Sequence, residues 1–120
     1  MPDDKPILYL LKRDFRDPAY PGKTFFCPFC LRLEGLLALY PQVRHATDVR
    51  YVGFNKPRGE LAEFAGDDSQ SCPQIIIQNG DDDCSKPYSA PGLNGVRRID
   101  STDHIIQYLI ERFGLSDVHP

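Results

Sequence analysis

Short apolar runs alternate with helix-type stripes along the 120 residues, and this alternation constrains the fold more than any other feature. The run Ile7–Leu11 is continuous and apolar, which is typical of a strand buried on both faces. Residues 30–40 then carry apolar side chains at helical spacing until Pro41 ends the pattern. Residues 48–54 return to the strand type. A strand, a helix and a strand in this order predict a parallel pair joined by a crossover.

The second half of the chain continues in the same way. We expect a second helix at residues 55–66 and a third strand at residues 73–77. A turn at 79–81 then opens a polar loop at 80–95. A fourth strand at 96–99 and a last helix at 101–114 complete the chain. Gly66 and Gly114 are the predicted helix ends, and Ser101 is the predicted cap of the last helix. The order β-α-β-α-β-β-α predicts an α/β fold of residues 1–120 as a single domain. Its four-stranded mixed sheet would carry helices on both faces.

Composition excludes several classes of function. The net charge is −3 and the basic residues form no long run, so we expect no binding to nucleic acid. No stretch approaches the roughly 18 apolar residues that cross a bilayer, so we expect no membrane span. The acidic N-terminus and the short apolar stretch after it do not fit a signal peptide, which favours a cytoplasmic location. In that compartment the four cysteines indicate reduced, catalytic or metal-binding thiols.

Cys27-Pro28-Phe29-Cys30 opens the first predicted helix. Unpaired backbone N–H groups and the helix dipole stabilise a thiolate at such a start, and Pro28 suits the first turn. One interpretation makes Cys27 the attacking thiolate and Cys30 the resolving thiol. The other is a buried structural pair with no redox role.

The remaining cysteines and the histidines are less informative. Cys72 has three interpretations: a third thiol near Cys27, a metal ligand beside Cys27 and Cys30, or a small buried hydrophobe. A structural zinc site needs four ligands, and Cys84 could complete one only if its loop folds back, so we predict no metal site. Cys84 is expected to be exposed, and residues 81–83 form a solvated acidic turn rather than a calcium loop. We expect the three histidines to lie on the surface: His45, His104 and His119.

Three motifs carry a resemblance to a known fold. They are Cys27-Pro28-Phe29-Cys30, Ser71-Cys72-Pro73 just before the third predicted strand, and Ile99-Asp100-Ser101 where the fourth strand meets the last helix. With the order of elements, they resemble the thioredoxin fold, and within it the glutaredoxins and the N-terminal domain of glutathione S-transferases. The whole chain also resembles the bacterial DUF3088 family, which shares the Asp17-to-Gly22 segment and the two cysteine motifs.

The resemblance implies a site and its partners. Pro73 would be cis, and the backbone of Cys72 would face the sulfur of Cys27. No cofactor would stay bound, glutathione would act as a co-substrate, and the partner would be a disulfide-containing protein or glutathione. The residues implied to contact substrate or glutathione are Lys12, Pro28, Phe29, Ser71, Cys72, Pro73, Asp100 and Ser101.

Two features depart from the glutaredoxin pattern. Fourteen residues separate Lys12 from Cys27, where a glutaredoxin has only a few, and Cys72 replaces the usual Thr or Val. Our first hypothesis is a thiol–disulfide oxidoreductase of glutaredoxin type. The alternative is a non-catalytic thioredoxin-like module that binds glutathione, a peptide or a protein, with the cysteines as a redox switch or metal site. The sequence gives no indication of the oligomeric state.

Overall fold

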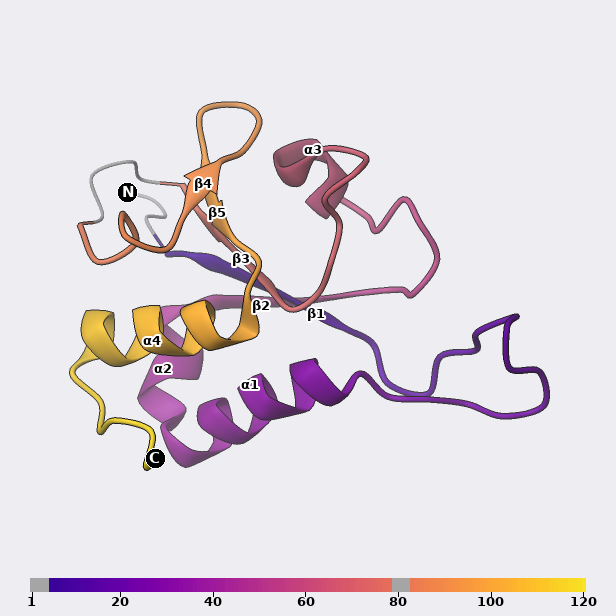
Figure 1. Cartoon of the computed structure of the whole chain (residues 1–120), viewed down its shortest axis with the longest axis horizontal. Coiled ribbons are helices and arrows are strands. Elements are labelled where there is room, and N and C mark those ends of the chain that lie inside the picture. Colours follow the sequence, from indigo (N-terminus) through magenta and orange to yellow (C-terminus); the bar gives the residue numbers. More distant parts are fainter. Residues whose placement is uncertain (1–4, 79–82) are drawn as a thin grey trace.

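A computed structural model describes residues 5–78 and 83–120 of the chain (Figure 1). The helices and strands alternate, as the sequence predicts. Two short elements, a helix at residues 41–46 and a strand at residues 90–91, were not foreseen. In chain order the helices and strands are β1 (Ile7–Leu11), α1 (Pro28–Leu39), α2 (Pro41–Ala46), β2 (Asp48–Val52), α3 (Leu61–Ala65), β3 (Gln74–Ile77), β4 (Ala90–Pro91), β5 (Arg97–Ile99) and α4 (Thr102–Phe113).

The strands form one mixed sheet in the order β2-β1-β3-β5-β4. β1 and β2 run parallel and pair Ile7 with Asp48 through to Leu11 with Val52. β3 is antiparallel to β1, and β5 is antiparallel to both β3 and β4. The predicted parallel pair and the predicted antiparallel addition are therefore confirmed. The predicted number of strands was wrong: residues 5–78 and 83–120 contain five strands, because Ala90 and Pro91 pair with β5 at the edge of the sheet.

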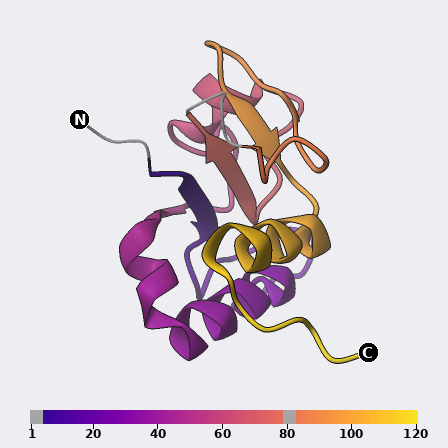
Figure 2. The same cartoon turned by 90° about the vertical axis from the view of Figure 1, so that its left-hand side faces the viewer.

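The sheet has a separate apolar core on each face. Figures 1 and 2 show the helices that cover them, with α1, α2 and α4 on one side and α3 on the other. Because side chains alternate along a strand, Leu8 and Leu10 face α1, α2 and α4, whereas Ile7 and Tyr9 face α3. All four side chains are at most 1 % exposed. This double burial explains the continuous apolar run of β1. The end of β1 lies beside the start of α1, where the cysteine pair lies.

Several helix boundaries follow from local chemistry, and others do not. Ser101 caps α4 by accepting a hydrogen bond from the His104 N–H at 3.4 Å, and Gly114 ends it in the left-handed conformation, as predicted. Pro41 ends α1 but also begins α2, since a proline is well suited to a first helical position. The helix predicted from residue 55 begins only at Leu61, and β2 ends at Val52 rather than at residue 54.

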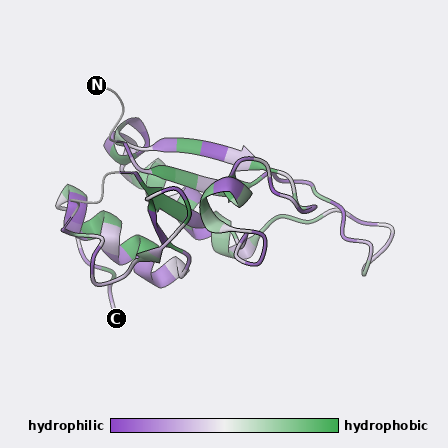
Figure 3. Cartoon of the chain, turned by 90° about the horizontal axis from the view of Figure 1, so that it is seen from above, coloured by the Kyte–Doolittle hydropathy of each residue, from purple (hydrophilic) through white to green (hydrophobic). Residues whose placement is uncertain are grey.

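Residues 13–26 form an arm that projects well beyond the rest of the chain (Figure 3). Phe15 and Phe25 exchange two backbone hydrogen bonds of 3.0 and 2.8 Å and close its base. Phe15 also stacks on Phe54, with 4.7 Å between ring centroids and 4° between planes. The arm is thus anchored to the loop after β2, and most of it extends away from the cysteine pair.

Two further points complete the comparison with the sequence. The predicted turn at 79–81 falls at the gap between the described ranges, which end at residue 78 and resume at residue 83. Within these ranges, no helix has both the length and the apolar character required to cross a bilayer.

Candidate functional site

Cys27 occupies the N-cap of α1. Its backbone is extended (φ −80°, ψ 118°), and Pro28 takes the first helical position. The Cys27 Sγ accepts a hydrogen bond from the Cys30 N–H at 3.2 Å. A helix-start N–H directed at a sulfur stabilises negative charge on it, as does the helix dipole. Because Cys27 is partly exposed, its sulfur can also meet a substrate.

Cys30 lies one turn later and has a different environment. It is only 4 % exposed and belongs to the core between the sheet and α1. Burial raises the pKa of the Cys30 thiol well above its ordinary value, and a hydrogen bond from the Leu11 N–H at 3.5 Å opposes this shift only in part. Cys30 is therefore a protonated thiol at neutral pH. All four cysteines are unbridged in this structure.

The loop that contains Cys72 and Pro73 lies against the start of α1. The Cys72–Pro73 peptide bond is cis, as the resemblance implied. The carbonyl oxygen of Cys72 lies 3.9 Å from the Cys27 Sγ, within reach of a hydrogen bond from the thiol. Burial raises the pKa of Cys72 to about 11, although the neighbouring Arg58 guanidinium favours its thiolate. The structure thus brings three of the four cysteines together.

Arg58 is a site residue that the sequence did not reveal. Its side chain is 9 % exposed, and its Nε and Nη1 donate to the carbonyl oxygens of Phe54 and Gln70 at 2.9 and 3.0 Å. The guanidinium also lies over the Phe54 ring, 5.4 Å from its centroid. Within residues 5–78 and 83–120, no carboxylate pairs with it. A buried cation without a carboxylate leaves a positive field beside Cys72.

A chain of hydrogen bonds joins the Cys72 loop to the predicted Asp100–Ser101 site. Gln74, fully buried beside Pro73, donates to the Ser71 carbonyl at 3.0 Å. Its Oε1 lies 3.5 Å from Arg98 Nη1, which pairs with Asp100 at 2.9 Å. Asp100 is therefore already partnered, and Ser101 is used as the cap of α4.

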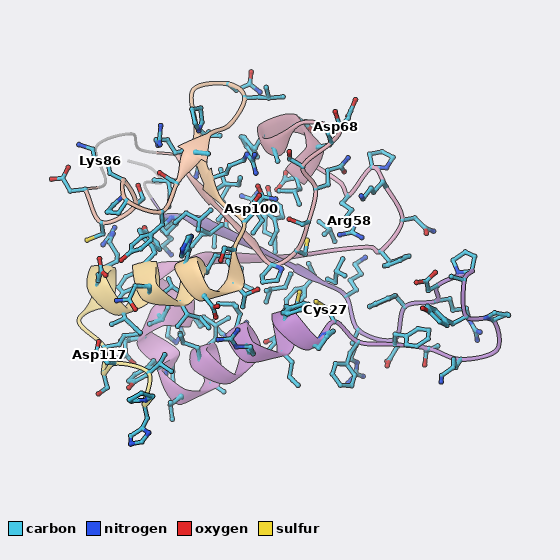
Figure 4. The ribbon with its side chains drawn as sticks, in the orientation of Figure 1. Cys27, Arg58, Asp68, Lys86, Asp100 and Asp117 are labelled. Carbon is cyan, nitrogen blue, oxygen red and sulfur yellow. The ribbon has the colours of Figure 1, made fainter. Side chains whose placement is uncertain are left out.

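A small hollow opens beside the pair on its other side. Its volume is about 110 Å³, and its walls include Cys27, Cys30, Phe26 and Leu31. Phe26, Phe29 and Leu31 are each more than half exposed, so apolar surface surrounds the Cys27 sulfur. Lys12 borders the next hollow along the end of β1. Figure 4 places Cys27 at the start of α1, near the middle of the view, and shows Lys86 and Asp117 at the left-hand end of the molecule.

Comparison with known proteins yields one family. Residues 5–117 match the profile of a family described as a protein of unknown function (DUF3088). The chain belongs to this family. The searches of curated proteins and of solved structures found no match. In this DUF3088 member, the matched region includes every residue of the candidate site.

The other cysteine and the histidines take simpler positions. The three histidines are exposed, as predicted. Cys84 was expected to be exposed, but it is half-buried and contacts the core between the sheet and α4. Among the residues that the structure describes, no three His, Cys, Asp or Glu side chains gather as a metal site would require.

The sequence missed Gln74 and Arg58 for different reasons. A single glutamine beside three isoleucines, Ile75–Ile77, was a usable signal, because a polar side chain in a fully buried strand needs buried partners. Arg58 gave no such signal. Its burial depends on Phe54 and Gln70, whose spacing in sequence does not indicate that they enclose the same guanidinium.

Proposed function

We propose that this chain is a thiol–disulfide oxidoreductase with a thioredoxin-like fold. The observation that carries the proposal is the Cys27 Sγ, which lies at the start of α1, accepts the Cys30 N–H at 3.2 Å and lies 3.9 Å from the Cys72 carbonyl oxygen. The fold is supported by the parallel β1–β2 pair, the antiparallel β3 and β5, and the position of the cysteine pair at the start of α1, the first helix after β1.

In the first step Cys27 attacks the substrate. Its thiolate forms a bond with one sulfur of a substrate disulfide, and the substrate S–S bond breaks. The other substrate sulfur leaves with the electron pair and takes a proton from solvent. The product is a mixed disulfide between Cys27 and the substrate. The helix start supports this step because it stabilises the thiolate before the attack.

In the second step Cys30 resolves the mixed disulfide. The Cys30 thiol loses its proton to the departing substrate thiolate, and its sulfur attacks the Cys27 Sγ. A Cys27–Cys30 disulfide forms, and the substrate is now fully reduced. Two molecules of a small thiol such as glutathione then reduce the protein and become one disulfide. Because burial raises the pKa of Cys30, we expect this resolving step to be slower than the first.

A second candidate is a binding module in which the cysteines act as a redox switch. The burial of Cys30 favours it, since a 4 % exposed thiol with a raised pKa would turn over slowly. In that case Cys27 would form a mixed disulfide and keep it. The partner of such a module would again be glutathione, a peptide or a protein thiol.

Reduction assays separate the two candidates. The probes are a mixed disulfide of glutathione with a chromogenic thiol and a peptide with one internal disulfide, each with glutathione as reductant. We expect turnover in the wild type, loss of turnover in Cys27→Ser and wild-type rates in Cys84→Ser. In Cys30→Ser we expect a trapped mixed disulfide, visible by mass spectrometry. A wild-type protein that forms this adduct but does not turn over would instead support the binding module, and failure to form any adduct would exclude both.

A further inference from the structure

The hollow beside the cysteine pair continues into a larger one. The second hollow has a volume of about 360 Å³ and lies along the end of β1, with Lys12, Asp14 and Tyr51 among its walls. The two hollows share three wall residues, which are Leu11, Arg13 and Glu34. They therefore form one groove that runs from the thiols to the edge strand β2. We call it the β1 groove.

Two cations and two carboxylates border the β1 groove, and the carboxylates are each paired with an arginine: Lys12, Arg13, Asp14 and Glu34. Glu34 is already engaged, because its carboxylate accepts Arg44 at 2.9 Å and the Tyr51 hydroxyl at 2.8 Å. Arg13 pairs with its neighbour Asp14 at 3.3 Å, with side chains 88 % and 69 % exposed. An ion pair that exposed contributes little, so the guanidinium remains available to a ligand. Within the described part of the chain, nothing accepts a hydrogen bond from the Lys12 ammonium.

The end of the groove next to the thiols is apolar. Phe26 and Leu31 border it and are 60 % and 55 % exposed, a larger exposure than a core side chain would show. An apolar side chain of a ligand could bury this surface while its neighbouring disulfide meets Cys27. The groove thus combines a reactive sulfur, an apolar wall and two exposed cations, Arg13 in a weak solvent-exposed pair and Lys12.

We infer that the β1 groove binds the segment of a protein substrate that carries the disulfide, and that it selects an acidic residue near that disulfide. The carboxylate pairs with Arg13 and Lys12, and an apolar side chain packs on Phe26 and Leu31. This inference rests on the proposed function, because Cys27 supplies the chemistry. It adds a substrate class: acidic, partly apolar peptide segments.

Peptide mixed disulfides test the preference. Each peptide carries one cysteine joined by a disulfide to a chromogenic thiol. A single variable residue, Glu, Gln or Lys, lies within four positions of that cysteine, before or after it. We expect kcat/KM to be about five- to tenfold higher for Glu than for Lys at low salt, which is the scale of two exposed ion pairs changed to repulsion. The difference should shrink at high salt, since exposed charges are screened. Arg13→Glu should remove the preference.

The matched control is Lys5→Glu, because Lys5 precedes β1 and Lys12 follows it. This variant carries the same change in charge at the opposite end of the strand and should keep the preference for Glu. Equal kcat/KM for Glu and Lys peptides, or an equal effect of the Lys5 and Arg13 variants, would overturn the inference. So would faster reduction of glutathione disulfide than of every peptide.

A binding measurement keeps the groove testable apart from the reaction. Peptides with serine in place of cysteine are labelled and titrated with the Cys27→Ser protein by fluorescence anisotropy. We expect the Glu peptide to bind about fivefold more tightly than the Lys peptide, and we expect Arg13→Glu to remove this difference. No turnover together with this preference would overturn only the redox function. Turnover without the preference would overturn only the groove.

Discussion

The thiols of Cys30 and Cys72 should make the protein lose stability at alkaline pH. Burial raises the pKa of Cys30 and raises that of Cys72 from 9.0 to about 11. A group with a raised folded-state pKa contributes stability that is complete below its unfolded-state pKa and is lost as the pH rises through its folded-state pKa. For Cys72 the loss therefore begins near pH 9 and is complete near pH 11.

The size of the effect follows from the shift. One pKa unit corresponds to about 1.4 kcal/mol, so the raised pKa of Cys72 corresponds to about 2–3 kcal/mol once its partial exposure is considered. Cys30 adds a similar slope, and between about pH 9 and pH 10 each thiol lowers the free energy of unfolding by about 1 kcal/mol. This is a large share of the roughly 5–15 kcal/mol that a domain has in total. Cys72→Ala should remove about half of the slope.

Urea unfolding in a phosphine reductant, at about pH 8.5 and pH 10, measures that slope. The pH range stops at about 10 because burial also raises the pKa of Tyr9, to about 12. Above pH 10 the ionisation of Tyr9 adds increasingly to the loss of stability. Ile105→Val is the control: it removes one buried methylene at a cost of about 1 kcal/mol and should keep the wild-type slope. A wild-type slope in both Cys72→Ala and Cys30→Ala would refute the reasoning, because neither thiol would then be held neutral by burial.

Two further predictions concern the edge of the sheet and the cation beside Cys72. Gly92→Ala would place a Cβ 2.6 Å from the Phe64 carbonyl oxygen and should lower the free energy of unfolding by about 1–3 kcal/mol. Gly35 is exposed within α1, and the Cβ of Gly35→Ala meets nothing within 4 Å, so this variant should raise the free energy of unfolding by about 0.5–1 kcal/mol. Urea unfolding measures both changes. Equal stability of the two variants would contradict this. Arg58→Met removes the cation beside Cys72, so thiol labelling against pH should show that the pKa of Cys72 rises above about 11; an unchanged pKa would mean that the guanidinium does not act on the thiol.

The sequence predicted best where structure is decided locally. The bounds of β1 follow from a continuous apolar run, and the ends of α4 follow from a serine cap and a glycine in the left-handed conformation. It predicted least well where a boundary depends on partners far along the chain. β4 is two residues long and exists only because it pairs with β5, so no periodicity could reveal it.

The candidate site divides in the same way. Cys27 and Cys30 are the first and last residues of a four-residue motif at one helix start, and their arrangement could be predicted from that motif. The approach of Cys72 came from the resemblance rather than from periodicity, since it lies 45 positions after Cys27. The burial of Arg58 could not be predicted, because it needs the Phe54 and Gln70 carbonyls at the same place.

The contrast between the two cysteines of the pair gives the proposed reaction its order. A substrate disulfide can reach Cys27, which is partly exposed, but not Cys30, which is 4 % exposed and holds its proton. Cys30 therefore has no bimolecular reaction of its own. It acts only once a mixed disulfide has formed on Cys27, one helical turn away, when the reaction becomes intramolecular and the low thiolate fraction is offset by proximity. The same burial that slows the resolving step also protects Cys30 from other oxidants between turnovers.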